Sequence, residues 1–360
     1  MLQAVNKEGQ LLAIWNLNKQ SWQKLKQKEN YYCPHCGNIV IAKFGTVITP
    51  HFAHASRQSC RLAGETQLHE QGKKDLFEWL VAQQLNPKLE YYLAETKQRA
   101  DIFLQIGKKK IVLEYQCATI PIEELAKRTN LYKQQRITPI WILGINRFKR
   151  IHELAISLHK QDVCFIHQYH PQYPLTIYFY CPITSYFIRF QHGTFFTKNK
   201  LVGTIKAKPL YQFSFQDIFA IQPTSTIGWK HVWSKEKQSW LLRTVPTYHL
   251  KEQKWRQWLY KQQLTIQDLP SYVYLPISSQ YRLKVQPWVW QSELYVKLIR
   301  RERSFRLSLA KRIVQHHYLP DTHFPLVASL QDPVTEYFQL LIKKNILIEN
   351  DGVFTNRENI

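Results

Sequence analysis

The apolar residues in the first half of the chain follow a helical spacing and then a strand spacing. From residue 64 onward they recur at steps of three and four, as from Leu76 to Trp79 and from Leu76 to Leu80, which predicts an amphipathic helix. The Asn86-Pro87 pair ends this helix. The segment LEYYLA then predicts a first strand, and RADIFLQIGKKKIVLEYQ, residues 99–116, predicts a hairpin of two more strands.

A second helix and a fourth strand complete this region. Pro121 suits the first turn of a helix, where its missing N–H is no loss, and this helix is expected to run to about Gln135. The continuously apolar segment TPIWILG, residues 138–144, is typical of a strand covered on both faces. The order helix, strand, strand, strand, helix, strand predicts one α/β domain over residues 61–150.

The pattern differs on either side of this domain. Residues 1–60 contain a predicted hairpin and then a compact block with Cys, His, Gly and Pro at turn positions, which indicates a small β module. Residues 151–360 are rich in β-branched and aromatic residues to about residue 250, and helical spacing returns after that. An α+β C-terminal region is therefore expected. These boundaries rest on changes of period alone.

The charge of the chain narrows the classes of partner. Lys and Arg total 49 against 26 acidic residues, a net charge of +23 that is spread along the chain. A protein this basic most often binds a polyanion, nucleic acid first and anionic membrane second; the alternative is a basic protein without such a partner. No uncharged apolar run approaches the roughly 20 residues of a membrane span, and no signal peptide is visible. A cytoplasmic location is expected, and no basic amphipathic anchor supports a peripheral membrane role.

Two carboxylates stand inside the predicted hairpin. If the chain turns at Gly107-Lys108, Asp101 lies directly opposite Glu114, and such pairs have Cβ atoms about 4.5–5.5 Å apart. Gln116 shares the face of Glu114, because side chains alternate along a strand. A slip of one residue would place the acids among the apolar side chains, so the pattern supports this register.

A divalent cation would explain the pair, because two like charges this close repel. Mg²⁺ or Mn²⁺, held by carboxylates and water, could lower the pKa of a bound water and stabilise charge on a scissile phosphate. Glu65 and His69 lie one turn apart on the apolar stripe of the preceding helix and are expected to face the sheet. The alternative is that Asp101 and Glu114 are edge-strand residues or partners in ion pairs.

The element order and these acids match the PD-(D/E)xK nuclease superfamily, with Gln116 in the lysine position. The chain also resembles the competence protein CoiA family through CPHCGNIVIAKFG, HFAHAS, GETQLHEQGKKDLFEWL, QRADIFL, LEYQCATI, AKRTNLYKQ and PIWILG, in order across residues 33–144. The resemblance implies a restriction-endonuclease-like α/β core that acts in DNA uptake and recombination during competence. It implies metal and catalytic positions at Glu65, Asp101, Glu114 and Gln116, with His69 and Lys73 close by.

Further residues of this region are candidates for DNA contact. Arg128 and Tyr132, one turn apart on the second helix, could face the scissile phosphate, or they could cap the sheet or pair with Glu124. Lys73 on the first helix is a further candidate. The lysines at the hairpin tip, residues 108–110, could bind a DNA backbone or simply be solvated.

The N-terminal block has the spacing of a zinc site. Cys33 and Cys36 are followed by His51 and His54, with Cys60 as a spare ligand, which suits a structural, four-ligand zinc-finger-like module. The alternative is a buried histidine pair beside a reduced turn.

Two functions remain open from the sequence. The first is a metal-dependent DNA nuclease in which Asp101 and Glu114 hold the cation and Gln116 orients water. The second is a DNA-binding recombination accessory factor that keeps the fold without cleavage. Both predict DNA as partner, single-stranded or in recombination intermediates, together with competence or recombination proteins. Basic and aromatic residues in the C-terminal helices could stack on single strands, or the aromatics could belong to the core. No phosphate-binding loop of the ATPase type is present.

Overall fold

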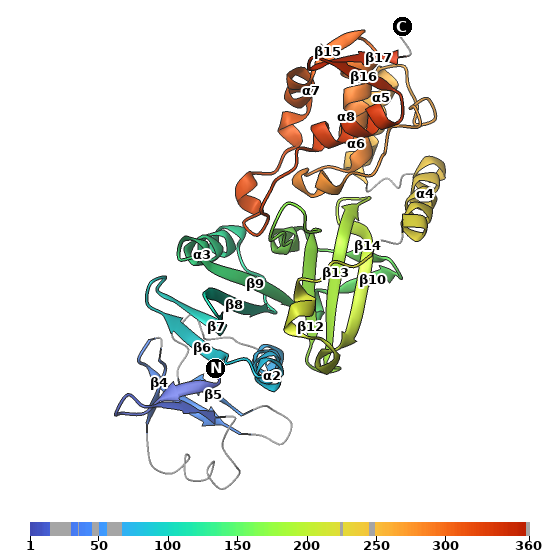
Figure 1. Ribbon diagram of the computed structural model, residues 1–360. Coiled ribbons are helices and arrows are strands. Elements are labelled where there is room, and N and C mark those ends of the chain that lie inside the picture. The colour runs from blue at the N-terminus through green and yellow to red at the C-terminus, as the bar shows by residue number, and fades with distance from the viewer. Residues whose placement is uncertain are drawn as a thin grey trace.

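The computed structural model of the chain describes residues 1–14, 30–34, 36–44, 50–55, 67–223, 226–244 and 249–357. Figure 1 shows a small N-terminal sheet at one end, a large central sheet flanked by helices, and a mostly helical C-terminal region at the other end. The predicted mixed α/β architecture is confirmed.

Five short antiparallel strands form the N-terminal sheet, in the order β2-β1-β3-β4-β5. Its small apolar core includes Cys33, Val40 and Phe52, which are nearly inaccessible to solvent. The strands are β1 (Gln3–Val5), β2 (Leu11–Ala13), β3 (Tyr31–Tyr32), β4 (Ile39–Lys43) and β5 (His51–His54).

The central sheet has nine strands in the order β10-β11-β14-β13-β12-β9-β8-β7-β6. Strand β9 pairs in parallel with β8 and with β12, and the other neighbours are antiparallel. The predicted boundary near residue 150 therefore falls inside one sheet. The strands are β6 (Lys88–Leu93), β7 (Gln98–Ile106), β8 (Lys109–Gln116), β9 (Ile137–Gly144), β10 (Lys149–His152), β11 (Ala155–Ser157), β12 (Thr176–Cys181), β13 (Tyr186–Phe195) and β14 (Lys200–Pro209).

Two helices cover opposite faces of the β6–β9 half of this sheet. On one face, α2 (Gln67–Ala82) packs Leu76 and Leu80 against a cluster that includes Leu113. On the other face, α3 (Ile122–Gln134) places Tyr132 in a cluster with Val112. The order α2-β6-β7-β8-α3-β9 is the order that the sequence predicts.

The predicted register of the β7–β8 hairpin is confirmed. Ile102 lies opposite Leu113 and Leu104 opposite Ile111. The turn begins at Gly107, whose φ of 56° lies in the left-handed region that glycine adopts without strain. Because this pairing is fixed, the residues next to Ile102 and Leu113 are brought side by side at the end of the ladder.

The C-terminal region surrounds a core rich in tryptophan, including Trp240, Trp255, Trp288 and Trp290. Trp255 is therefore a core residue, whereas Tyr260 on the same helix is 73% exposed. A three-stranded sheet, in the order β15-β17-β16, closes the region. The elements are α4 (Thr226–Leu242), α5 (Leu250–Lys261), α6 (Pro287–Leu294), the π-helical turn η7 (Tyr295–Ile299), β15 (Ser304–Arg306), α7 (Leu307–Val314), α8 (Pro333–Lys343), β16 (Leu347–Asn350) and β17 (Val353–Asn356).

A segment of the C-terminal region packs firmly against the central sheet. Phe324 and Val327 belong to the same apolar cluster as Trp141 of β9. A parallel bridge pairs Val327 with Gln168. These contacts fix the position of the C-terminal region relative to the sheet.

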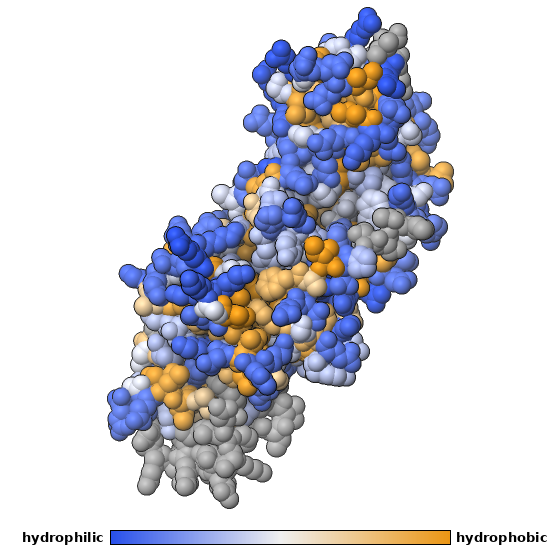
Figure 2. Space-filling view, viewed as in Figure 1, coloured by the Kyte–Doolittle hydropathy of each residue, from blue (hydrophilic) through white to orange (hydrophobic). Residues whose placement is uncertain are grey.

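The face of the molecule shown in Figure 2 is mostly hydrophilic. Figure 2 shows polar residues over most of one face, interrupted by separate apolar patches. Within the described residues, no helix is both long and apolar enough to cross a membrane.

Candidate active site

Asp101 and Glu114 lie next to each other where β7 and β8 separate. Asp101 precedes Ile102 on β7 and Glu114 follows Leu113 on β8, so each stands next to the last pair of the ladder. The side chain of Asp101 turns toward the gap, where its Oδ2 accepts a hydrogen bond from the backbone N–H of Tyr115 at 2.8 Å. Asp101 is 17% exposed and Glu114 only 2%. The hairpin thus places one accessible and one buried carboxylate at the same site.

Helix α3 supplies two partners for Glu114. Arg128 donates from Nη2 to Glu114 Oε2 at 2.7 Å, and the Tyr132 hydroxyl donates to Oε1 at 2.5 Å. The two residues are four positions apart, so they lie on one face of the helix, toward the sheet. The Arg128 guanidinium also lies over the ring of Trp141, 5.1 Å from its centroid. Arg128 therefore pairs with Glu114 rather than with Glu124.

Burial makes the charged form of Glu114 expensive. It raises the pKa of Glu114 from 4.5 to about 7, and the nearby charge of Asp101 pushes the pKa the same way. Arg128 and the hydroxyl of Tyr132 oppose this shift without cancelling it. A carboxyl group with a pKa near neutrality, beside a second carboxyl, is typical of functional sites and is also found in structural ion pairs.

Helix α2 brings a histidine to the pair. This residue is His69, whose Nε2 atom lies 3.6 Å from Asp101 Oδ2. The His69 ring stacks on the Tyr115 ring, with centroids 5.7 Å apart. The close approach of α2 requires glycine at position 72, because a Cβ there would lie 2.1 Å from the Tyr115 ring. Glu65, the predicted third acid, lies outside the described residues.

Gln116 and Lys73 are held by other groups. The Gln116 amide nitrogen donates to the Ala118 carbonyl at 2.8 Å, and the side chain keeps partial exposure. Lys73 is fully buried and pairs with Glu70 at 3.3 Å and Glu90 at 2.7 Å. Contrary to the prediction, the Lys73 ammonium is not available to DNA, because it neutralises two buried carboxylates.

The other residues predicted to contact DNA differ in how far their side chains are exposed to solvent. The Tyr132 side chain is also inaccessible, so its hydroxyl serves Glu114 and not a phosphate. Arg128 keeps 24% of its side chain exposed. At the hairpin tip, Lys108 and Lys109 are exposed and Lys110 is half-buried.

Three predicted zinc ligands come together in the N-terminal module. The ligand atoms of Cys33, Cys36 and His54 lie within 4.8 Å of one another, and Cys36 Sγ is 3.4 Å from His54 Nε2. His51 starts the same strand but is not part of this group. Cys60 lies outside the described residues.

Known proteins of one family match this chain along its length. The N-terminal domain of competence protein CoiA matches residues 14–63, its nuclease-like domain residues 65–223, and its C-terminal domain residues 229–356. The competence protein CoiA of Bacillus subtilis (strain 168) is 30% identical over 346 residues, which cover 92% of this chain and 91% of that protein. The chain belongs to the CoiA family. No solved structure matches it.

In this CoiA chain, the carboxylate pair and its partners all lie within the match to the nuclease-like domain. Such a domain suggests interaction with nucleic acid. One neighbour of the site, Trp141, was not a candidate in the sequence, because it reads as one more apolar residue of a buried strand. The parallel register of β8 and β9 reveals it, since it places Glu114 beside Trp141.

Proposed function

We propose that this protein is a divalent-metal-dependent DNA nuclease of restriction-endonuclease type that acts during competence. The observation that carries the proposal is the placement of Asp101 beside a buried Glu114 whose pKa is raised to about 7. A bound cation stabilises two carboxylates that lie close together, and hard divalent cations prefer carboxylate ligands.

The donor set fits Mg²⁺ or Mn²⁺. Each carboxylate oxygen has about two lone-pair directions, so the hydrogen bonds from Arg128 and Tyr132 leave Glu114 able to bind a cation. When bound, the metal would lower the pKa of a water and neutralise charge on the scissile phosphate. Arg128 and Tyr132 act as positioning residues that fix the Glu114 carboxylate.

Gln116 takes a more limited role in this proposal. Its amide nitrogen is already held by the Ala118 carbonyl, so its amide oxygen is the group that accepts a hydrogen bond from the attacking water. A neutral amide supplies no positive charge to the phosphate, unlike the lysine of the wider superfamily.

Purified full-length protein, incubated with single- and double-stranded DNA with and without Mg²⁺ or Mn²⁺, tests the proposal. Cleavage should require metal and be lost in Asp101→Asn and Glu114→Gln. The control is Glu95→Gln, which removes an exposed carboxylate from the neighbouring β6–β7 turn and should cleave like wild type. Equal cleavage by wild type and both site variants would refute the assignment.

A second candidate is a non-catalytic DNA-binding accessory factor that retains the nuclease-like fold. The observation that favours it is that both oxygens of Glu114 already accept hydrogen bonds within the protein. This candidate predicts salt-dependent DNA binding, no cleavage with either metal, and unchanged binding in Glu114→Gln.

We also propose that Cys33, Cys36 and His54 hold a structural zinc ion. Thiolate and imidazole are the ligands that zinc prefers, and a module with a core this small gains stability from a metal. Metal analysis of the purified protein should find about one zinc per chain by this reasoning. A protein purified without chelator that contains no zinc would exclude it.

A further inference from the structure

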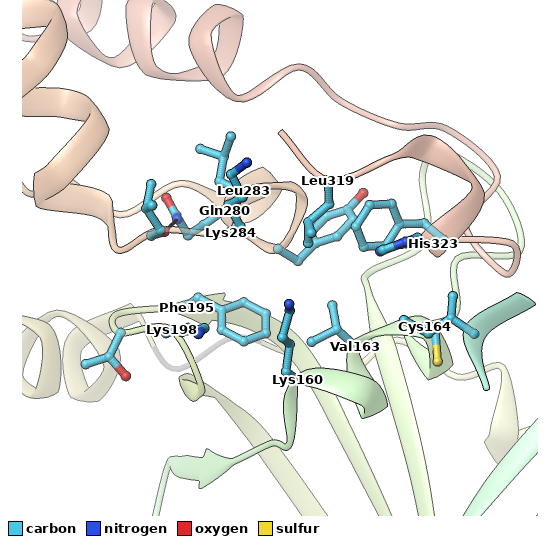
Figure 3. A pocket seen from close by; sticks show the side chains of 15 residues that line it. Lys160, Val163, Cys164, Phe195, Lys198, Gln280, Leu283, Lys284, Leu319 and His323 are labelled. Atoms are coloured by element: carbon cyan, nitrogen blue, oxygen red, sulfur yellow. Dashed lines mark hydrogen bonds between the residues drawn. The ribbon is translucent and has the colours of Figure 1, made fainter. Parts of the chain in front are cut away.

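A cavity lies between the central sheet and the C-terminal region (Figure 3). One wall comes from the short helix η3 (Lys160–Phe165) and the turn after β13. The opposite wall comes from the end of η6 (Ser278–Arg282) and the residues after it, together with η9 (Asp321–His323) and its neighbours. Lys160 points across the gap toward the opposite wall in Figure 3.

Three lysines line this cavity and no acidic residue does. Lys160 and Lys198 stand on the first wall and Lys284 on the second, and all three are exposed. None of the ion pairs found between described residues involves any of them. A fourth lysine, Lys251 in the first turn of α5, acts on Lys198 electrostatically. We refer to these four residues as the lysine cluster.

Lys198 is electrostatically disfavoured by its surroundings in the protein alone. Partial burial and the neighbouring ammonium groups of Lys251 and Lys160 lower the pKa of Lys198, and no carboxylate offsets this effect. Four separate elements contribute the charges, so the clustering does not follow from one charged stretch of sequence. Repulsion of this kind is relieved when an anion binds among the charges.

Apolar and polar contacts join the two walls of the cavity. Phe195 and Phe324, from opposite walls, belong to one apolar cluster. Behind the cavity, the Lys133 ammonium of α3 donates to the Pro325 carbonyl at 2.5 Å. These contacts hold the lysines near one another, and a bound anion would relieve their repulsion.

The position of the cluster favours a DNA strand as the anion. Ile122, the first residue of α3, lines the cavity, and Arg128 of the same helix pairs with Glu114. Six residues of helix correspond to about 9 Å along its axis, a few nucleotide steps at most. Helix α3 therefore connects the cavity lining to the candidate site.

We propose that the lysine cluster binds the phosphate backbone of a DNA strand whose neighbouring nucleotides reach the Asp101–Glu114 site. The proposal rests on the DNA-directed function proposed above and assigns the surface that holds the substrate. The contacts would be to phosphates, because ammonium groups on flexible stems act as point charges and carry no information about base sequence.

The triple variant Lys160→Gln/Lys198→Gln/Lys284→Gln tests this assignment. Binding of a fluorescent single-stranded oligonucleotide is measured by anisotropy over a range of salt concentrations. Loss of three phosphate contacts should make the negative slope of log K against log salt shallower by about 2. It should also weaken binding at least roughly tenfold at low salt. Without DNA, the melting temperature of the variant should equal or exceed that of wild type at low salt, and the difference should vanish at high salt.

A matched control separates this surface from general charge. Lys7→Gln/Lys235→Gln/Lys343→Gln removes three exposed lysines that do not line the cavity and the same net charge. Equal loss of binding in the two triple variants, or equal retention, overturns the lysine cluster as the binding surface.

The failure of this inference is distinguishable from failure of the nuclease. Glu114→Gln should bind the oligonucleotide like wild type even though it does not cleave. If the Lys160/Lys198/Lys284 triple variant binds DNA as well as wild type does, the inference alone is overturned. If wild type binds DNA but does not cleave it, and the Lys160/Lys198/Lys284 triple variant loses binding, the inference is supported and the proposed nuclease activity is overturned.

Discussion

Replacing Glu114 with glutamine should stabilise the fold above neutral pH. The pKa of Glu114 rises from 4.5 to about 7 on folding, and at about 1.4 kcal/mol per unit this corresponds to roughly 3 kcal/mol. Between these pH values the folded protein keeps a proton that the unfolded chain has lost. The free energy of unfolding therefore falls as pH rises through this window and stays lower above it.

Glutamine resembles the protonated form of Glu114 in shape and charge. Its single amide oxygen can accept the hydrogen bond from Arg128, its amide nitrogen can donate to the Tyr132 hydroxyl, and it has no charge to desolvate. The variant should match wild type near pH 4.5 and gain up to roughly 3 kcal/mol by pH 8. Part of this gain should disappear when Mg²⁺ or Mn²⁺ is added, because a cation stabilises only the carboxylate form.

Urea unfolding at pH 5, 6, 7 and 8 measures this difference. Wild type and Glu114→Gln are compared with Glu95→Gln, whose exposed side chain should leave the pH dependence unchanged. The reasoning is refuted if the Glu114→Gln variant is less stable than wild type at pH 8, or if the gap does not widen from pH 5 to 8. Either result would mean that the ion pair with Arg128 outweighs the cost of burial.

Three further substitutions test other parts of the structure. Lys73→Met should destabilise the protein by up to about 3–5 kcal/mol, because Glu70 and Glu90 each lose a buried cationic partner, although Arg99 still pairs with Glu90; an unchanged urea midpoint would contradict this. Gly72→Ala should cost about 1–3 kcal/mol or more, since its Cβ would collide with the Tyr115 ring, and a melting temperature equal to wild type would argue against the close α2 approach. Cys36→Ser should abolish zinc retention measured by elemental analysis, and full zinc occupancy in the variant would remove Cys36 from the proposed ligands.

The local part of the candidate site could be predicted from the sequence. Alternation of apolar residues along β7 and β8 allows one register only, and that register brings Asp101 beside Glu114. The i, i+4 spacing of Arg128 and Tyr132 likewise put both on one face of α3. These predictions succeeded because each depends on residues that are close in the chain.

Features that depend on distant contacts were not predictable. Lys73 reads as one more charged residue of an amphipathic helix, and only the irregular backbone of β6 brings Glu90 to it, at a positive φ of 49°. The continuation of the sheet from β9 to β12 joins residues more than 30 positions apart. The lysine cluster likewise draws one residue from each of four elements.

The parallel pairing of β9 with β12 sets where this protein can be divided for experiments. A fragment that ends near residue 150 would lose β12 and expose the edge of β9, one of the most apolar strands in the chain. Such an edge recruits other chains, so the fragment should aggregate. A fragment that extends to residue 223 keeps the whole sheet, although it uncovers the apolar surface beneath Phe324 and Val327. The proposed nuclease activity is therefore best tested with point substitutions in the full chain.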